Sequence, residues 1–305
     1  MNAYVTNPAE VALSNTPPVL LAATSDAAMS AAERTVLASG FRIGARLPLA
    51  SAKARIEEQP ALTALWVELD RDNDAVDELL DLLARDADRG RYAAVVSTSV
   101  NLLDAVSARL GDSDVELIAD ASEADRTAAI SVATTRRSMQ LSVQDIAGDK
   151  NAERLRQLSE EVSRIASTLA RLSAGPGAPR PALKPPPVSD TPQLSPDTVR
   201  NVIRARRLRA RFFSEELFAD PAWDMLLDLL QAEIAQLRVP VSSLCIAAAV
   251  PATTALRWLK ALVSQGLFVR RADPHDGRRV FVELAPEASH ALRRYFAEVG
   301  PVAVI

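Results

Sequence analysis

The stretch "PATTALRWLKALVSQGLFVRRADPHDGRRVFVEL", Pro251 to Leu284, decides the fold of the C-terminal third of this 305-residue chain. Its first half repeats apolar residues at helical spacing and ends at Gly266, where a helix C-cap favours glycine. Two short runs of strand-forming residues follow, "LFVRRA" and "RRVFVEL", and Pro274 and Gly277 between them supply turn geometry. The stretch therefore predicts one helix followed by a β-hairpin.

Two more helices are predicted directly before this stretch. The run "PAWDMLLDLLQAEIAQ" is amphipathic, and "PVSSLCIAAAV" fits a short second helix. Only a tight turn around Ala249 and Val250 separates the short helix from the one that begins near Pro251, which is the spacing of a helix-turn-helix. A last helix, "PEASHALRRYFAEV", follows the hairpin. Helix, turn, helix and hairpin in this order predict a winged helix.

The block from about residue 197 to residue 300 resembles the MarR family of transcriptional regulators. Members of that family carry a comparable short helix, recognition helix, "GL-hydrophobic-R" step and "DP-x-D-x-RR" wing. The resemblance implies binding to double-stranded DNA. It places Thr253, Thr254 and Arg257 toward the major groove, where threonine and arginine can contact base edges or phosphates, with Lys260 as a flanking contact. The packing side of this helix then holds Leu256, Trp258, Leu259 and Leu262.

The hairpin supplies the remaining candidate DNA contacts. A wing meets backbone phosphates or the minor groove, so its arginines and the residues at its tip are the expected contacts. They are Arg270, Arg271, His275, Gly277, Arg278 and Arg279. Asp276 is expected to hydrogen-bond the turn and to pair with Arg278, which would hold the hairpin rigid.

The charge distribution agrees with a polyanionic partner at this end of the chain. The formal net charge is −4, but residues 1–199 hold 20 Lys and Arg against 28 Asp and Glu, whereas residues 200–305 hold 15 against 11. Basic side chains that neutralise phosphates release condensed counterions, which favours binding. The basic balance of the last third is therefore a second indication of nucleic acid.

A basic helix is predicted at the start of this last third. Ser195 can cap it, and Pro196 suits its first position. Six arginines and no acid lie between residues 200 and 211. One face of the helix carries Arg200, Arg204, Arg207 and Arg211. This face either contacts phosphates or is solvated.

The N-terminal half alternates short apolar runs with helical patterns. Five runs, "VLLAATS", "FRIGARLPL", "LTALWVEL", "YAAVVSTS" and "VELIADA", lie between residues 19 and 140, and each precedes a stretch able to form a helix. This alternation predicts a doubly wound α/β domain with a five-stranded parallel sheet. The first run continues into "TSDAAMS" without a glycine, which argues against a dinucleotide-binding turn.

The length and order of these elements resemble the receiver domain of response regulators. The resemblance places the phosphoacceptor on Glu68 if the following loop keeps its usual length, or on Asp70 if the loop is shorter. Ser97 or Thr98 suits the hydroxyl position after the fourth strand.

Two other receiver features are missing from the sequence. The acidic pair that holds magnesium in receivers corresponds to Ala23 and Thr24, or at best to Ser25 and Asp26, and "LIADASEA" lacks the receiver lysine. Without these groups, phosphoryl transfer would lack charge neutralisation. The prediction is a degenerate receiver-like domain, with Asp70 as the best remaining acceptor.

Three further segments complete the predicted organisation. Residues 1–18 form an N-terminal extension, and residues 174–196, with eight prolines in 23 positions, form a semi-rigid linker to the DNA-binding domain at 197–305. Between them, residues 145–173 predict an amphipathic or coiled-coil helix that either joins two copies of the chain or packs on its own N-terminal domain. Its heptad positions are Leu155, Leu158, Val162, Ile165, Leu169 and Leu172.

Several functional classes are excluded by residues that the sequence lacks. Cys245 is the only cysteine, and His275 and His290 are the only histidines, so neither a disulfide framework nor a metal centre is expected. No paired carboxylates in a glycine-framed site, nucleophile with a histidine or phosphate loop is visible, so neither an enzyme nor a cofactor is expected. With no basic residue before Arg34 and no long uncharged apolar run, the chain is expected in the cytoplasm, on the nucleoid when bound to DNA.

The sequence as a whole predicts a DNA-binding transcriptional regulator. Its expected partners are double-stranded DNA, a second copy of the chain and, at the receiver-like domain, a protein; a membrane is not expected. The alternative function is an interaction adaptor whose receiver-like domain and winged helix dock on protein partners.

Overall fold

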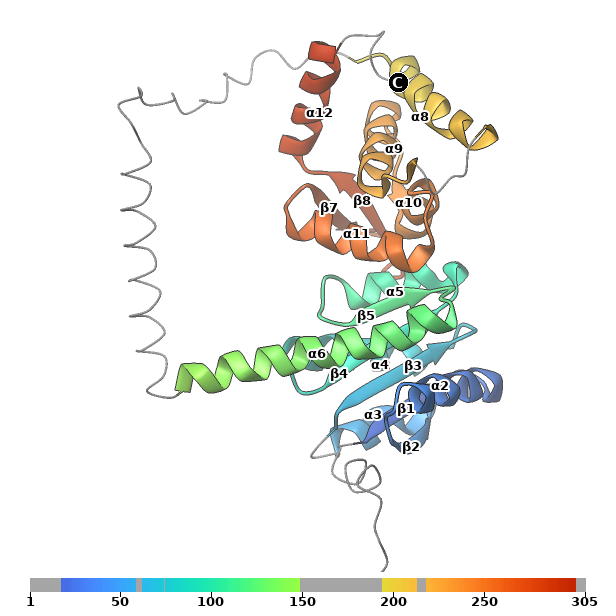
Figure 1. Cartoon of the computed structure of the whole chain (residues 1–305), viewed down its shortest axis with the longest axis vertical. Helices are drawn as coiled ribbons and strands as arrows, with labels where there is room; N and C mark the ends of the chain where they lie inside the picture. The colour runs from blue at the N-terminus through green and yellow to red at the C-terminus, as the bar shows by residue number, and fades with distance from the viewer. Residues whose placement is uncertain (1–17, 59–61, 74, 149–193, 213–217, 300–305) are drawn as a thin grey trace, which may run out of the picture. The chain divides into compact units, whose positions relative to one another are not determined.

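The computed structural model is shown in Figure 1, and it describes the chain in five stretches. They are residues 18–58, 62–73, 75–148, 194–212 and 218–299. The chain divides into two compact units, the first made of residues 1–135 and 191–305 and the second of residues 136–190. The predicted heptad residues, from Leu155 to Leu172, lie outside the described residues, as does most of the predicted linker.

A five-stranded parallel sheet forms the N-terminal part of the first unit. Its strands are β1 (Val19–Ala23), β2 (Ile43–Pro48), β3 (Ala64–Leu69), β4 (Ala93–Thr98) and β5 (Glu116–Ala119). They are ordered β2-β1-β3-β4-β5, and each predicted apolar run supplies one strand, so the doubly wound sheet is confirmed. The strand order reverses between β1 and β3, and sheets of this kind bind ligands outside the carboxyl ends of the strands at that point.

Helices cover both faces of this sheet. They are α2 (Asp26–Ala38), α3 (Leu49–Glu57), α4 (Ala75–Asp88), α5 (Leu103–Leu110) and α6 (Glu123–Gly148), with a 3-10 turn η1 (Val100–Leu102) before α5. Successive strand side chains point to opposite faces. Leu21 and Trp66 therefore pack against α2 and α6, whereas Leu20 and Leu65 pack against α3, α4 and α5.

The C-terminal part of the first unit is the predicted winged helix. Its elements are α8 (Pro196–Leu208), η2 (Arg209–Arg211), α9 (Pro221–Ala235), β6 (Val239–Pro240), α10 (Val241–Ala247), α11 (Ala252–Ser264), β7 (Phe268–Ala272), β8 (Val280–Leu284) and α12 (Pro286–Val299). The Ser195 hydroxyl accepts a hydrogen bond from the Asp197 backbone N–H, so the predicted cap of α8 is confirmed. Gly266 follows α11 with φ +72°, the conformation that favours glycine.

The three strands of the winged helix form an antiparallel sheet in the order β6-β8-β7. The sequence predicts β7 and β8 but not β6. The missing strand has only two residues, Val239 and Pro240, which is too short for an alternating pattern.

The winged helix packs around a core to which α9 contributes Met225 and Leu230, and α11 contributes Leu256, Leu259 and Leu262. Trp258, predicted on the same side of α11, is 41% exposed, so that prediction is wrong. At 3.6 residues per turn, Trp258 falls just outside the arc that these leucines bury.

Among the described residues, no single helix is long and apolar enough to cross a membrane. The bent pair α10 and α11 meets that length and composition only when the two are taken together, and both helices contribute to the winged-helix core.

Candidate nucleic-acid interface

The helix-turn-helix consists of α10 and α11, whose directions differ by 108° across the turn. This angle lies in the range of DNA-binding helix-turn-helix motifs. Ala249 makes the turn with φ +53°, and the Pro251 carbonyl accepts the first helical hydrogen bond, from Ala255. Helix α11 therefore occupies the position of a recognition helix.

The wing is a tight hairpin between β7 and β8. Its turn is closed by two backbone hydrogen bonds, from the Asp273 N–H to the Arg279 carbonyl and from the Arg279 N–H to the Asp276 carbonyl. The Asp276 carboxylate also accepts a hydrogen bond from the Arg278 N–H at 3.0 Å. The predicted turn role of Asp276 is confirmed. Its predicted ion pair with Arg278 is wrong, because Asp276 pairs with the Arg279 guanidinium at 3.2 Å while Arg278 pairs elsewhere. Arg279 is three residues from Asp276 and reaches it within the turn.

Four predicted contacts lie exposed on this wing: Arg271, His275, Gly277 and Arg279. Arg271 pairs with Glu283 across the hairpin at 3.4 Å, and both side chains are about half exposed or more. Arginines that pair only at the surface exchange partners at small cost. This part of the wing is thus available to a polyanion.

Of the six other predicted contacts, Thr254 is half-buried in α11. The remaining five face the N-terminal sheet domain, and we call them the recognition surface: Thr253, Arg257, Lys260, Arg270 and Arg278. Thr253 is 1% exposed, and its hydroxyl donates to the Ala119 carbonyl at 3.2 Å and accepts from the Ala119 N–H at 3.3 Å. Arg257 Nε donates to Glu116 Oε1 at 3.2 Å. The recognition helix therefore lies against the end of β5.

The wing base and the end of α11 make contacts of the same kind. Lys260 Nζ donates to the Ser113 carbonyl at 2.9 Å, and Arg270 Nη1 donates to the Gly111 carbonyl at 2.7 Å. Arg278 holds the Asp72 carboxylate with two hydrogen bonds, at 2.9 and 3.2 Å. Each of these cations is thus matched by a carbonyl oxygen or a carboxylate.

A further contact involves a residue that sequence reasoning missed. Asp104 in α5 accepts hydrogen bonds from the backbone N–H of Ser242 at 2.9 Å and from its hydroxyl at 2.5 Å. The Ser242 N–H lies in the first turn of α10, where backbone N–H groups have no partner within the helix. The two residues are 138 positions apart, and no local pattern announces such a pair. We call the opposing side the docking face: Asp104, Gly111, Ser113, Glu116 and Ala119, together with Asp72.

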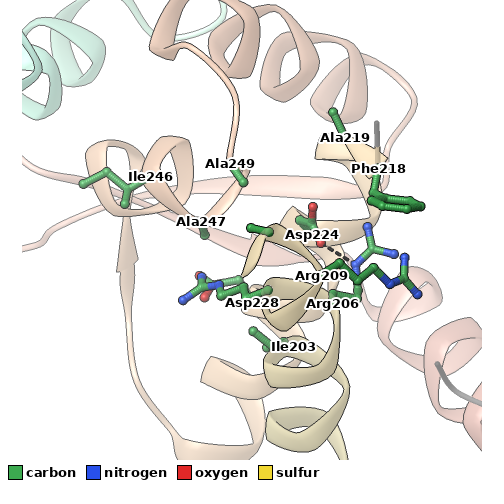
Figure 2. Close-up of a pocket in the computed structure, with 12 residues that line it drawn as sticks. Ile203, Arg206, Arg209, Phe218, Ala219, Asp224, Asp228, Ile246, Ala247 and Ala249 are labelled. Carbon is green, nitrogen blue, oxygen red and sulfur yellow. Dashed lines mark hydrogen bonds and ion pairs between the residues drawn. The ribbon is translucent and has the colours of Figure 1, made fainter. Parts of the chain in front are cut away.

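All four arginines of the predicted face of α8 are exposed. Arg200 pairs with Asp197 at 2.9 Å, and Arg207 lines a pocket of about 300 Å³ between α8, α9 and α10 (Figure 2). In this pocket Arg206 pairs with Asp224 at 2.6 Å. Burial raises the pKa of Asp228 there, and the charge of Arg207 offsets this only in part. The walls thus carry both signs of charge beside apolar side chains.

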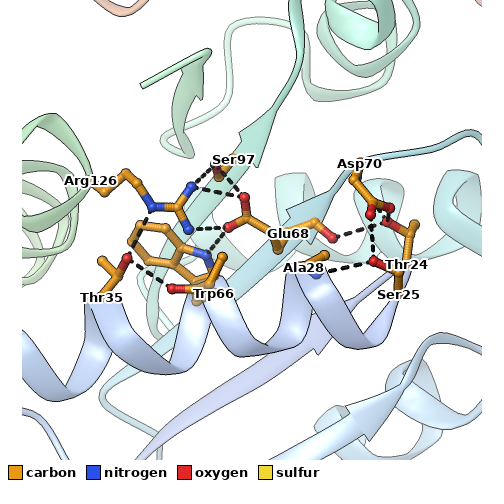
Figure 3. Close-up of polar contacts among 10 residues, drawn as sticks. Thr24, Ser25, Ala28, Thr35, Trp66, Glu68, Asp70, Ser97 and Arg126 are labelled. Atoms are coloured by element: carbon orange, nitrogen blue, oxygen red, sulfur yellow. Dashed lines mark hydrogen bonds and ion pairs between the residues drawn. The ribbon is translucent and has the colours of Figure 1, made fainter. Parts of the chain in front are cut away.

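The two candidate phosphoacceptors, Glu68 and Asp70, lie close together at the end of β3 but in different surroundings (Figure 3). Asp70 directly follows β3, and its carboxylate accepts hydrogen bonds from the hydroxyls of Thr24, at 2.7 Å, and Ser25. Burial acts to raise the pKa of Asp70, but the Ser25 and Thr24 hydrogen bonds and Arg71 outweigh it, so the pKa is lowered. Asp70 is therefore an ionised, hydrogen-bonded surface carboxylate.

Glu68, in contrast, belongs to a buried network. Arg126 in α6 donates to its two carboxylate oxygens at 2.8 and 2.6 Å, and Ser97 Oγ and Trp66 Nε1 donate at 3.0 and 2.8 Å. The Arg126 guanidinium also lies 5.2 Å from the centroid of the Trp66 ring. Sequence reasoning missed Arg126, because a single arginine inside a helix has no distinguishing signal.

We expect Asp70 to take up no phosphate. Incubation of the chain with a small phosphodonor should leave its mass unchanged, because Thr24 and Ser25 hold the carboxylate and the expected metal-binding acids and lysine are missing from the sequence. Intact-mass measurement reads this directly. One added acid-labile phosphate that is absent from Asp70→Asn would show the opposite.

Among the described residues, no group of three or more His, Cys, Asp and Glu side chains is placed to hold a metal ion. The single cysteine, Cys245, is buried in α10. Burial is the main reason that the pKa of its thiol is raised to about 12, so it is a core residue at neutral pH.

Comparisons with known proteins agree with the winged helix. Residues 236–288 match the family model of the winged helix DNA-binding domain, so the predicted winged helix is confirmed. No curated protein matches the chain. Two similar solved structures are the adhesin competence repressor AdcR from Streptococcus pyogenes (18% identity, 33% of this chain and 71% of that chain, TM-score 0.22) and the transcriptional regulator Tm0710 from Thermotoga maritima (18%, 34% and 79%, 0.21).

Proposed function

We propose that this protein is a transcriptional regulator of the MarR-like kind that binds double-stranded DNA through its winged helix. The observation that carries the proposal is the ordered set α10, α11, β7 and β8, which matches the winged helix DNA-binding domain model over residues 236–288. The basic balance of residues 200–305 supports the same partner. The proposal assigns no catalytic step to the chain.

In this proposal, α11 enters the major groove and the wing follows the backbone. Thr253, Thr254 and Arg257 contact bases or phosphates, and Lys260 contacts a flanking phosphate. The wing contributes Arg270, Arg271, His275, Gly277, Arg278 and Arg279. A homodimer formed through Leu155, Leu158, Val162, Ile165, Leu169 and Leu172 would place two such helices on half-sites about 34 Å apart or a multiple of that.

The N-terminal domain is proposed to be a regulatory pseudo-receiver. Its strand order, β2-β1-β3-β4-β5, is that of the flavodoxin-like doubly wound folds, to which receivers belong. Glu68, at the end of β3, is already paired with Arg126. A carboxylate neutralised in this way is a poor phosphoacceptor, which supports regulation without phosphorylation.

The proposal is tested on the exposed wing. Arg271→Ala and Arg279→Ala, made separately in the full chain, should each weaken binding to genomic fragments, because each removes a cation that can reach a phosphate. The slope of log K against log[salt] should fall by about 0.9 for each lost phosphate contact. Binding is measured by fluorescence anisotropy at several salt concentrations.

The matched control for these variants is Arg55→Ala in α3, which removes the same charge from an exposed ion pair with Glu58 in the N-terminal domain. It should leave both affinity and slope unchanged. If both wing variants behave like this control, the assignment of the wing to DNA is refuted.

A second candidate function is favoured by one observation, namely that the recognition helix contacts protein in the structure through Thr253 and Arg257. An adaptor could use the same surface for a partner protein. The salt experiment separates the two functions, since an adaptor would not be retained on DNA at any salt concentration.

A further inference from the structure

We infer that the docking face of the N-terminal domain acts as a built-in competitor of DNA, because it covers the recognition surface of the winged helix. In the closed chain, α11 and the base of the wing cannot reach a duplex until the two parts separate. This inference rests on the proposed DNA binding and adds the regulation of that same surface.

The N-terminal domain already occupies the hydrogen-bonding side chains of α11. Thr253 is 1% exposed, and its hydroxyl is already used both as donor and as acceptor by the backbone of Ala119. A base edge or phosphate would have to occupy the place of β5 to make the same bonds. Strand β5 and a DNA duplex cannot occupy the same space, so DNA cannot reach α11 while this contact persists.

The charges of the docking face and the recognition surface are complementary. The docking face carries the carboxylates of Asp72, Asp104 and Glu116. Asp72 and Glu116 accept hydrogen bonds from arginines of the recognition surface, and Asp104 accepts one from the Ser242 hydroxyl. Two backbone carbonyls, of Gly111 and Ser113, take Arg270 and Lys260. Arginine and lysine bind phosphate oxygens through the same donors. The docking face thus presents to the winged helix the kind of acceptors that a DNA backbone presents.

Apolar packing between the two parts adds to these polar contacts. Leu103 of α5 and Ala119 of β5 are at most 1% exposed and belong to the same apolar cluster as Leu244, Leu256 and Phe268 of the winged helix. Removal of apolar surface from water favours association without regard to salt. The closed arrangement therefore does not depend on ion pairs alone.

Part of the wing stays outside this contact. Arg271, His275 and Arg279 remain exposed in the closed chain, so it can still meet DNA weakly. When only the open fraction of a protein is competent to bind, its apparent dissociation constant is the intrinsic one divided by that fraction. The expected behaviour is reduced DNA affinity rather than none.

The test uses a docking variant, Asp104→Asn with Glu116→Gln, in the full chain. Both changes lie in the N-terminal domain, keep side-chain size and remove the charge that faces Ser242 or Arg257. One charge-assisted hydrogen bond can shift an equilibrium by about tenfold, so the variant should bind genomic DNA fragments at least about tenfold more tightly than the native chain.

The matched control is Glu33→Gln with Glu78→Gln. It removes the same two charges from the N-terminal domain, but from exposed ion pairs with Arg46 and Lys53. The docking variant and the control therefore carry the same net charge and are repelled equally by DNA. The control should bind like the native chain, and the thermal unfolding of all three proteins confirms that each is folded.

A second measurement needs no variant. Binding of a genomic DNA fragment to the native chain should raise amide hydrogen exchange in α5 and β5, because their covered face becomes open to water. Tighter binding by the docking variant together with this rise supports the inference. Equal affinity of native chain, docking variant and control overturns it while leaving the proposed function intact. If none of the three binds DNA, both statements fall.

Discussion

Replacing Arg126 by alanine is expected to lower the free energy of unfolding by about 3–5 kcal/mol, the cost of leaving a buried charge without its partner. Arg126 and Glu68 are 12% and 11% exposed at their side chains, and two hydrogen bonds join them. Glu68 would keep only the bonds from Ser97 and Trp66, which do not neutralise its charge. Urea unfolding, followed by circular dichroism, measures the change.

Two further variants test whether Arg126 and Glu68 form a buried, energetically coupled pair. Arg46→Ala breaks an ion pair with Glu33 at the surface and should cost much less, because solvent screens such a pair. The double variant Arg126→Ala with Glu68→Gln should recover part of the loss, since it removes the uncompensated charge. A cost for Arg126→Ala no larger than that for Arg46→Ala would contradict a buried, energetically coupled pair.

The elements of both parts could be predicted because their signals are local. Continuous apolar runs mark strands that are buried on both faces, as β3 and β4 are. Ser195 and Pro196 mark the start of α8, and Gly266 marks the end of α11. Each of these signals acts within a few residues, so one sequence is sufficient to find it.

The contacts that matter most for function could not be predicted in this way. The recognition helix was correctly placed within the winged helix, but its burial against β5 depends on residues 134 to 147 positions away in sequence. The choice between Glu68 and Asp70 likewise depended on the loop, and only the structure shows that Arg126 takes Glu68 out of solvent. In both cases the deciding contact joins residues that lie far apart in sequence.

Phe268→Ala is expected to destabilise the winged helix by about 3–5 kcal/mol, through lost burial and the cavity that remains. Phe268 begins β7, is 2% exposed and packs in the apolar cluster that includes Leu256 and Leu284. Phe212→Ala is the matched control, because it removes the same side chain from a position that is 77% exposed and should change stability by less than about 0.5 kcal/mol.

The same pair of variants also reports on how the two parts are coupled. Leu103 and Ala119 of the N-terminal domain share the cluster with Phe268, so a cavity at Phe268 should also loosen the docking face. Hydrogen exchange should then rise in α5 and β5 of Phe268→Ala well below its unfolding midpoint, and not in Phe212→Ala. Loss of stability confined to the winged helix, with exchange in β5 unchanged, would show that the apolar part of the contact contributes little, and that ion pairs and hydrogen bonds hold the recognition helix in place.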